Sequence, residues 1–202
     1  MPALCVGLAI CAASTAMREW TTQGILLAMH GPMDDRLQVL ADHADDPPEA
    51  LGDRATAGLA ELALMAAAQG ASPGERSLAK ARAAQQIGRL TRLRPDWAAT
   101  QILIAQLDLL EHPSASSDGL KAFAASYRLG PFRMQEARWR IAYGAALWPR
   151  MSNDTRQQML NEAEWLSRFD DDQRGSIEKL LGDSPAGMAY QYRMTGGAML
   201  RP

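Results

Sequence analysis

The hydrophobic positions of this chain recur every three or four residues, which is the spacing of a helix face and not of a strand. In the clearest stretch, Ala79, Ala83, Ile87 and Leu90 follow one another at spacings of four, four and three. No segment of useful length alternates between apolar and polar positions, so strands are not expected. The pattern therefore predicts an all-α fold.

Glycine and proline divide the chain into successive predicted helices. Ser72-Pro73-Gly74-Glu75 combines an N-cap, a proline at the first helical position and an acid three residues after the cap. Thr155 to Gln158 resembles a second capping box, and Ser184-Pro185 is expected to cap a last, weakly apolar segment. The other predicted helices span 49–69, 73–93, 97–111, 118–129, 133–148 and 172–181. In helix 133–148, Met134 and Trp148 are expected on the inner face, and Phe169 is expected on the inner face of the helix that begins at Thr155.

Two proline-ended helices share a short motif. Arg92-Leu93-Arg94-Pro95 recurs as Arg128-Leu129-Gly130-Pro131, and before each motif a small residue precedes a large one by four positions, as in Ala83 with Ile87 and Gly119 with Phe123. Small residues let two helices approach and the large residue fills the groove between them. The spacing resembles the second half of a tetratricopeptide repeat. We therefore expect antiparallel helical hairpins in a right-handed, tetratricopeptide-like array.

That resemblance is partial, because the signature of the first helix of the repeat is absent. Gln101, Ile104-Ala105 and Asp108 stand at its positions. A plain helical bundle that contains one chance repeat is the alternative.

The first stretch, Ala3 to Ala16, is apolar and carries no charge. It is shorter than the roughly 20 residues that a spanning helix needs, and its length suits a signal peptide, with Ser14-Thr15-Ala16 as a cleavage site. No Lys or Arg precedes it, which is untypical. The alternatives are a longer helix through Met29 held at a membrane by Trp20, a buried helix of a soluble protein, or a misplaced start codon.

These boundaries predict four parts. Residues 1–30 are expected to form a signal-like or membrane-anchor-like helix, and 31–52 a linker that holds a short helix near 35–43. Residues 53–194 are expected to form one helical domain, and 195–202 a flexible tail.

Composition narrows the function classes. The 202 residues are enough to bury a core, and the net charge of −2 argues against a nucleic-acid binder. The two cysteines, Cys5 and Cys11, both lie in the first apolar stretch. The rest of the chain can therefore hold neither a disulfide nor a cysteine-ligated zinc.

The titratable residues show no catalytic or cofactor motif. His30, His43 and His112 have no metal-ligand spacing, and His112 is expected to end a helix. Asp170-Asp171-Asp172 reads as a helix end followed by a cap, more than as a cation site. No phosphate loop, dinucleotide fingerprint or nucleophile elbow occurs, so we predict neither a cofactor nor a metal nor an enzyme. Glu136 and Glu162 are the carboxylates that a glycan-active enzyme would use.

One basic cluster is a candidate partner site. Arg82, Arg89 and Arg92 are predicted to lie opposite the Ala83–Ile87–Leu90 face and to bind an anionic partner or glycan, or to form a solvated outer face. Four tryptophans stand out in an aromatic-poor chain and are mostly expected in the core: Trp97, Trp139, Trp148 and Trp165.

From about Ser77 to Leu181 the chain resembles the VpsP family of polysaccharide-biosynthesis proteins. The residues that carry the resemblance are Leu90–Trp97, Tyr127–Phe132 and Ala145–Pro149. The resemblance implies a membrane-anchored or periplasmic accessory of exopolysaccharide biosynthesis or export that offers a helical surface to a protein partner, with no catalytic residues. A soluble cytoplasmic adaptor with a buried first helix is the alternative.

Overall fold

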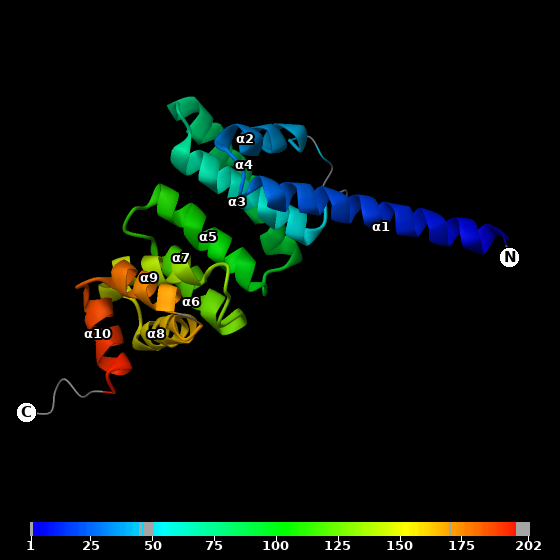
Figure 1. Cartoon of the computed structure of the whole chain (residues 1–202). Helices are drawn as coiled ribbons and strands as arrows, with labels where there is room; N and C mark the ends of the chain where they lie inside the picture. Colours follow the sequence, from blue (N-terminus) through cyan, green and yellow to red (C-terminus); the bar gives the residue numbers. More distant parts are fainter. Residues whose placement is uncertain (1, 45, 47–50, 170, 197–202) are drawn as a thin grey trace, which may run out of the picture. The chain divides into compact units, whose positions relative to one another are not determined.

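The computed structural model describes residues 2–44, 46, 51–169 and 171–196, with the side chains of the first helix from Thr15 onward (Figure 1). Within these residues the chain is all-helical and has no strand, which confirms the predicted fold class. The elements are α1 (Pro2–Ala28), α2 (Met33–Asp42), α3 (Asp53–Gln69), α4 (Pro73–Leu93), α5 (Ala98–Glu111), α6 (Ser117–Leu129), α7 (Ala137–Ala146), a 3-10 turn (Trp148–Arg150), α8 (Asn153–Ser167), α9 (Asp171–Leu181) and α10 (Pro185–Met194).

The chain divides into two compact units, 1–95 and 96–202. The prediction of one helical domain over 53–194 did not place this boundary. The boundary follows Pro95, which lies beyond the end of α4 and cannot continue a helix.

The first unit is built on the hairpin of α3 and α4. Ser72 caps α4 through the predicted reciprocal capping box with Glu75, which confirms this start signal. The apolar stripe Ala79, Ala83, Ile87 and Leu90 is buried, as the periodicity predicts. Alanine-rich α3 lies against this stripe, because its small side chains permit a close approach.

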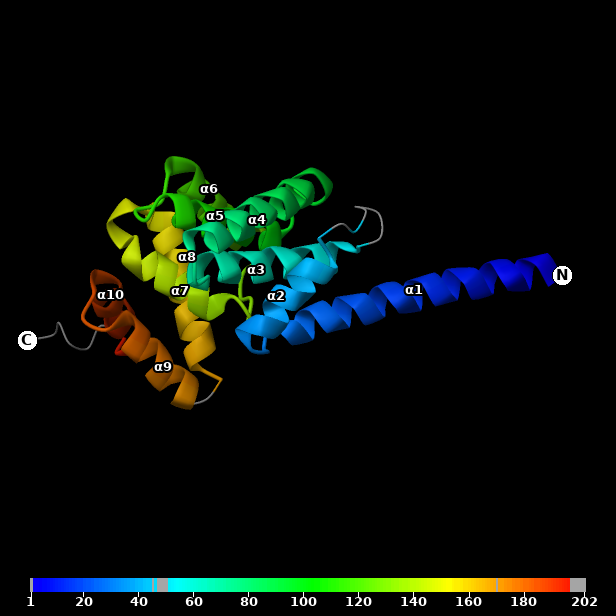
Figure 2. The ribbon, with the colours of Figure 1, turned by 90° about the horizontal axis from the view of Figure 1, so that it is seen from above.

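Helix α1 also packs on α3, through side chains of its second half. Thr22, Ile25 and Ala28 recur at three-residue spacing and are buried. Gly58 of α3 makes room for this contact, since a Cβ there would lie 2.8 Å from Cγ2 of Ile25. Both views show the first half of α1 running on past the end of α3 (Figures 1 and 2).

The predicted linker 31–52 contains more structure than a linker would. Helix α2 occupies Met33–Asp42 and packs on both α1 and α3, with Leu40 buried. The short helix expected near 35–43 is therefore present, and the packed apolar residue makes it part of the first unit.

The second unit starts with the hairpin of α5 and α6, and α7 to α10 complete it. Its core is aromatic, with Phe123 fully buried beneath Tyr143 and Tyr127 at centroid distances of 4.6 and 5.4 Å. Gly119, Phe123 and Ser126 are buried at the spacing that corresponds to Ala83, Ile87 and Leu90 in the first unit. Each unit therefore holds one hairpin whose second helix ends two residues before a proline.

Three local expectations are wrong. Helix α7 begins at Ala137 and not at 133, because Glu162 accepts the Arg133 N–H and holds the preceding residues in a turn, leaving Met134 exposed. Helix α8 is capped by Ser152, whose hydroxyl accepts the Thr155 N–H at 3.2 Å, so Thr155 already lies inside the helix. Phe169 lies beyond the end of α8 and is exposed.

The contact between α1 and α3 can be tested by adding carbon atoms at two glycines. We expect Gly58→Val to destabilise the first unit by about 1–3 kcal/mol, because the new side chain overpacks against buried Ile25. Gly24→Ala is the matched control, since a Cβ there meets nothing within 4 Å, and helix propensity should make it stabilising by about 0.5–1 kcal/mol. Native-state hydrogen exchange of the α3 amides measures both effects. Equal effects of the two substitutions would contradict the contact.

Candidate functional site

A fully buried ion pair joins α7 and α8. The guanidinium of Arg140 donates from Nε to Oε2 of Glu162 at 3.0 Å and from Nη2 to the other carboxylate oxygen. Arg140 and Glu162 are 0% and 1% exposed, respectively. A buried charge without a partner is very costly, so neither residue can be removed alone without a large penalty.

Arg140 also caps the end of α6. Its Nη1 donates to the carbonyl oxygens of Gly130 at 2.9 Å and Ser126 at 3.3 Å, which are among the last acceptors of that helix. Its guanidinium lies 4.3 Å from the centre of the Tyr127 ring. Glu162 in turn accepts the Arg133 N–H at 3.1 Å. One ion pair thus ties α6, α7, α8 and the 130–136 turn together.

Burial shifts the titration of this cluster. Desolvation raises the pKa of Glu162, and the hydrogen bonds and charge of Arg140 offset only part of that rise. Burial also raises the pKa of Tyr127 well above its ordinary value, and the nearby Glu162 carboxylate raises it further. Desolvation therefore has a larger effect on the pKa values of Glu162 and Tyr127 than the neighbouring charges have.

Both carboxylates considered for a glycan-active enzyme are held by arginines. Glu162 pairs with Arg140, and Glu136 accepts from Nε and Nη2 of Arg133 at 3.0 and 2.6 Å. Glu162 reaches the 130–136 turn from α8, whereas Glu136 lies in that turn as the N-cap of α7, and neither lines the groove described next. Their geometry is that of structural ion pairs.

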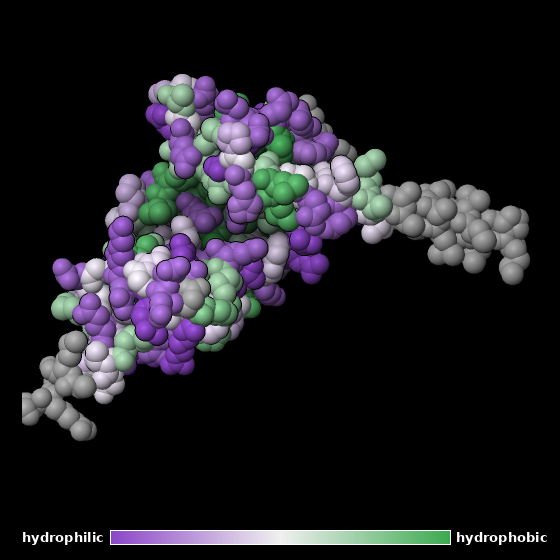
Figure 3. Space-filling model, viewed as in Figure 1, coloured by the Kyte–Doolittle hydropathy of each residue, from purple (hydrophilic) through white to green (hydrophobic). Residues whose placement is uncertain are grey.

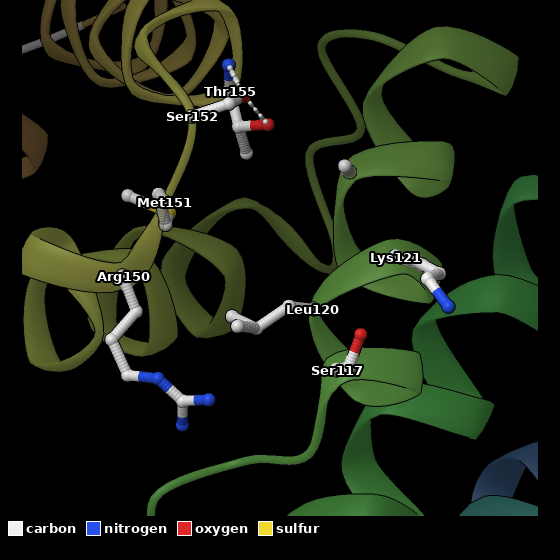
Figure 4. Close-up of a pocket in the computed structure, with 8 residues that line it drawn as sticks. Ser117, Leu120, Lys121, Arg150, Met151, Ser152 and Thr155 are labelled. Atoms are coloured by element: carbon white, nitrogen blue, oxygen red, sulfur yellow. Dashed lines mark hydrogen bonds between the residues drawn. The ribbon is translucent and has the colours of Figure 1, made fainter.

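An open groove of about 450 Å³ lies between α6 and the segment 150–155. Figure 4 shows Arg150 and Met151 on one side, Ser117, Leu120 and Lys121 from α6 on the other, and Ser152 with Thr155 at the start of α8. Ala124 completes the lining. The groove therefore combines two cations, three hydroxyls and an apolar middle.

The loop before α6 shapes one end of this groove. Nη1 of Arg150 donates to the carbonyl oxygens of Ser114 and Ala115, and Oδ2 of Asp108 accepts the Ser116 N–H at 2.8 Å. Ala115 has a φ of 57°, which turns its carbonyl sharply from the preceding chain. Gly119 admits the Asp108 carboxylate, because a Cβ at that position would collide with it.

The Asp108 carboxylate is adapted to that role. Burial alone would raise its pKa, but the hydrogen bonds from Ser116 and His112, with the charge of His112, lower the pKa below its ordinary value. His112 stands at the C-cap of α5, as predicted, and its Nδ1 lies 3.0 Å from Oδ1 of Asp108. The charged form of Asp108 therefore holds the loop.

Three aromatic rings form a row at the surface of the second unit. Trp165 of α8 lies 5.5 Å from Phe132 and 4.9 Å from Phe169, measured between ring centroids. Phe132 and Phe169 are 45% and 54% exposed, and they are two of the three phenylalanines of the chain. We call Phe132, Trp165 and Phe169 the aromatic row.

The backbone at Phe132 is strained in a way that maintains the row. Its φ is 57°, a left-handed conformation that a bulky residue rarely adopts. Such strain persists only where the surroundings enforce it, and here Glu162 accepts a hydrogen bond from the N–H of the next residue, Arg133.

On the space-filling surface, apolar side chains gather in separate patches among hydrophilic ones (Figure 3).

The three arginines predicted as a partner site do not form one free surface. Arg89 is half-buried and donates to the Leu51 carbonyl oxygen at 3.1 Å, so it fixes the chain before α3. Arg82 is half-buried and only Arg92 is exposed. At about 100° per residue, Arg92 lies opposite the buried stripe of α4 while Arg82 and Arg89 lie on its flanks.

The four tryptophans predicted mostly for the core are all partly exposed. Trp139 and Trp148 pack against the core of the second unit while partly exposed, and Arg156 lies over the ring of Trp148 at 5.3 Å. Trp97 is the half-buried N-cap of α5. Trp165 belongs to the aromatic row. Periodicity could not show this, because Phe132 lies outside any helix.

Neither the groove nor the row was foreseen from the sequence. The groove joins α6 to residues about 30 positions later, and only Thr155 among its hydroxyls had been singled out. For the acidic run, Asp171 and Asp172 occupy the first turn of α9, where carboxylates suit the helix dipole, and Asp170 lies outside the described residues. No cluster of metal-ligating side chains occurs among the residues that the structure places.

The comparisons with known proteins give no relative. No family model, curated protein or solved structure matches the chain. Among the helices whose residues are described, none is long and apolar enough to cross a membrane. The resemblance to the VpsP family therefore stays a prediction.

The buried pair can be tested against the neighbouring, partly buried pair of Arg133 and Glu136. We expect Glu162→Gln to destabilise the second unit by about 3–5 kcal/mol, because it leaves Arg140 charged and buried without its carboxylate. Glu136→Gln should cost about 1 kcal/mol or less, since the Arg133 side chain of that pair is 29% exposed. Urea unfolding followed by tryptophan fluorescence measures both. Similar losses for the two variants would refute the structural role of Glu162.

Proposed function

We propose that this chain is a non-catalytic adaptor that binds a protein partner through the aromatic row. The supporting observation is the exposure of Phe132 and Phe169 on either side of Trp165. Large aromatic side chains are enriched among the residues that dominate protein interfaces. Strain at Phe132 is more readily explained by such a surface than by packing, since nearly half of this side chain meets solvent.

The carboxylates that could serve in catalysis already have bonding partners, which favours an adaptor over an enzyme. Glu162 and Glu136 are each bonded to an arginine, and Asp108 holds a loop. An acid that works in catalysis must reach a substrate proton. These three carboxylates instead hold turns and helix ends in place.

Helix α1 supplies a membrane tether in this proposal. Its uncharged stretch Ala3–Ala16 continues into a face where Trp20 and Leu27, seven residues apart, are 80% and 71% exposed. That face is opposite the stripe that packs on α3. An apolar helix face with an exposed tryptophan suits the interface between lipid and water.

The two hairpins, α3 with α4 and α5 with α6, are proposed to belong to one tetratricopeptide-like array. Support comes from the shared proline-ended motif and the equivalent buried positions in each unit. The resemblance to the VpsP family adds exopolysaccharide biosynthesis or export as the process, at the inner membrane or in the periplasm. A soluble cytoplasmic adaptor with a buried first helix is the second candidate, and the packing of buried Ile25 on α3 supports it.

Partner binding is tested by removing the two exposed rings. We expect Phe132→Asn with Phe169→Ser to reduce recovery of cross-linked partners at least about tenfold, while the fold is kept because asparagine tolerates a left-handed backbone. The measurement is quantitative mass spectrometry of partners cross-linked to the tagged full chain in cells.

The matched control is Leu78→Ser with Leu93→Ser. It removes two side chains of α4 that are each 55% exposed, and it should leave recovery unchanged. If the aromatic variant recovers the same partners in the same amount as the unaltered chain, the aromatic row is not the interface.

The tether is tested by flotation of the full chain with phosphatidylcholine–phosphatidylglycerol vesicles. We expect the chain to float, and Trp20→Ser with Leu27→Ser to reduce the floating fraction several-fold, because both substitutions replace an exposed apolar side chain by a polar one. Gln23→Ala, at another exposed position of α1, should float like the unaltered chain. A chain that remains with the soluble fraction would rule out the tether and favour the cytoplasmic candidate.

A further inference from the structure

The charged residues that line the groove between α6 and the segment 150–155 are all positive. Its lining includes Arg150 and Lys121 and no acidic residue. Asp118 pairs with Lys121 at 2.8 Å, but their side chains are 86% and 74% exposed, so water screens this pair strongly. The groove therefore presents positive charge.

Arg150 can accept a further partner without leaving its place. Both of its hydrogen bonds come from Nη1 and go to the carbonyls of Ser114 and Ala115. Its Nε and Nη2 meet no acceptor among the residues that the structure describes. A guanidinium fixed on one nitrogen and open on the others can bind an oxyanion through paired hydrogen bonds.

The apolar part of the lining could pack against a short hydrocarbon chain. Leu120 lies between Arg150 and Ser117 in the close-up, and Ala124 and Met151 extend this apolar middle (Figure 4). A volume of about 450 Å³ lies in the range of small-molecule sites. An apolar surface beside open donors is the complement of an anion carried on a short hydrocarbon.

We propose that this groove binds a small organic anion, a carboxylate or a phosphate monoester on a short apolar chain. The head group accepts from Nε and Nη2 of Arg150, and Ser117 lines the groove on the other side of Leu120. The chain lies on Leu120 and Met151. This inference goes beyond the proposed adaptor function and does not depend on it, because the groove contains no residue of the aromatic row.

The test is an NMR titration of the ¹⁵N-labelled full chain with four six-carbon probes. We expect hexanoate or hexyl phosphate to shift the amides of 117–124 and 150–155 in a saturable way, and the stronger of the two identifies the head group. Uncharged 1-hexanol and cationic hexylammonium should bind at least about tenfold more weakly, because neither offers a negative charge to the Arg150 guanidinium. Equal binding of hexanol, or no shift in these segments with either anion, would overturn the proposal.

A pair of variants separates binding from folding. Ser117→Asp places a carboxylate in the first turn of α6, where it favours the helix, yet it should weaken binding of the preferred anion by at least about tenfold. Asn153→Asp adds the same charge to the first turn of α8 with a side chain that does not line the groove, and it should retain most of the affinity. If Ser117→Asp binds as tightly as the unaltered chain, the anion is not held where proposed.

Discussion

The second unit depends on one buried charge pair. Arg140 neutralises Glu162 and also satisfies carbonyl groups at the end of α6, so a single guanidinium joins three helices. Because both charges are removed from water, their pairing has little tolerance for displacement. The turn at 130–136 is therefore held rigidly, since Glu162 also binds its backbone at Arg133.

This rigidity explains how an exposed surface can carry backbone strain. Phe132 precedes the residue that Glu162 holds, and its left-handed conformation turns the ring towards Trp165. A loop without such an anchor would relax and lose the row. The proposed partner surface and the buried ion pair thus belong to one arrangement, in which the stability of the interior is used to position rings at the exterior.

Spacing and cap residues predict most helix boundaries correctly, but they do not predict contacts between residues that are distant along the chain. The α4 start at Ser72, the C-cap at His112 and the buried stripe of α4 all follow from spacing and cap residues. The α7 start did not, because a carboxylate 29 positions away binds Arg133 and ends the local preference for helix. Helical spacing alone predicts Arg89 as a surface charge for a similar reason, since its acceptor is the distant carbonyl of Leu51.

By itself, the sequence determined the all-helical class, the proline-ended hairpins and the uncharged character of the first stretch, because each depends on neighbours three or four residues apart. Only the tertiary structure decided which charges are buried in pairs, which rings face solvent and where a groove opens. Those features join residues that are distant along the chain, and their energies come from desolvation and contact geometry. Helical periodicity records which face is apolar, but not which other helix covers that face.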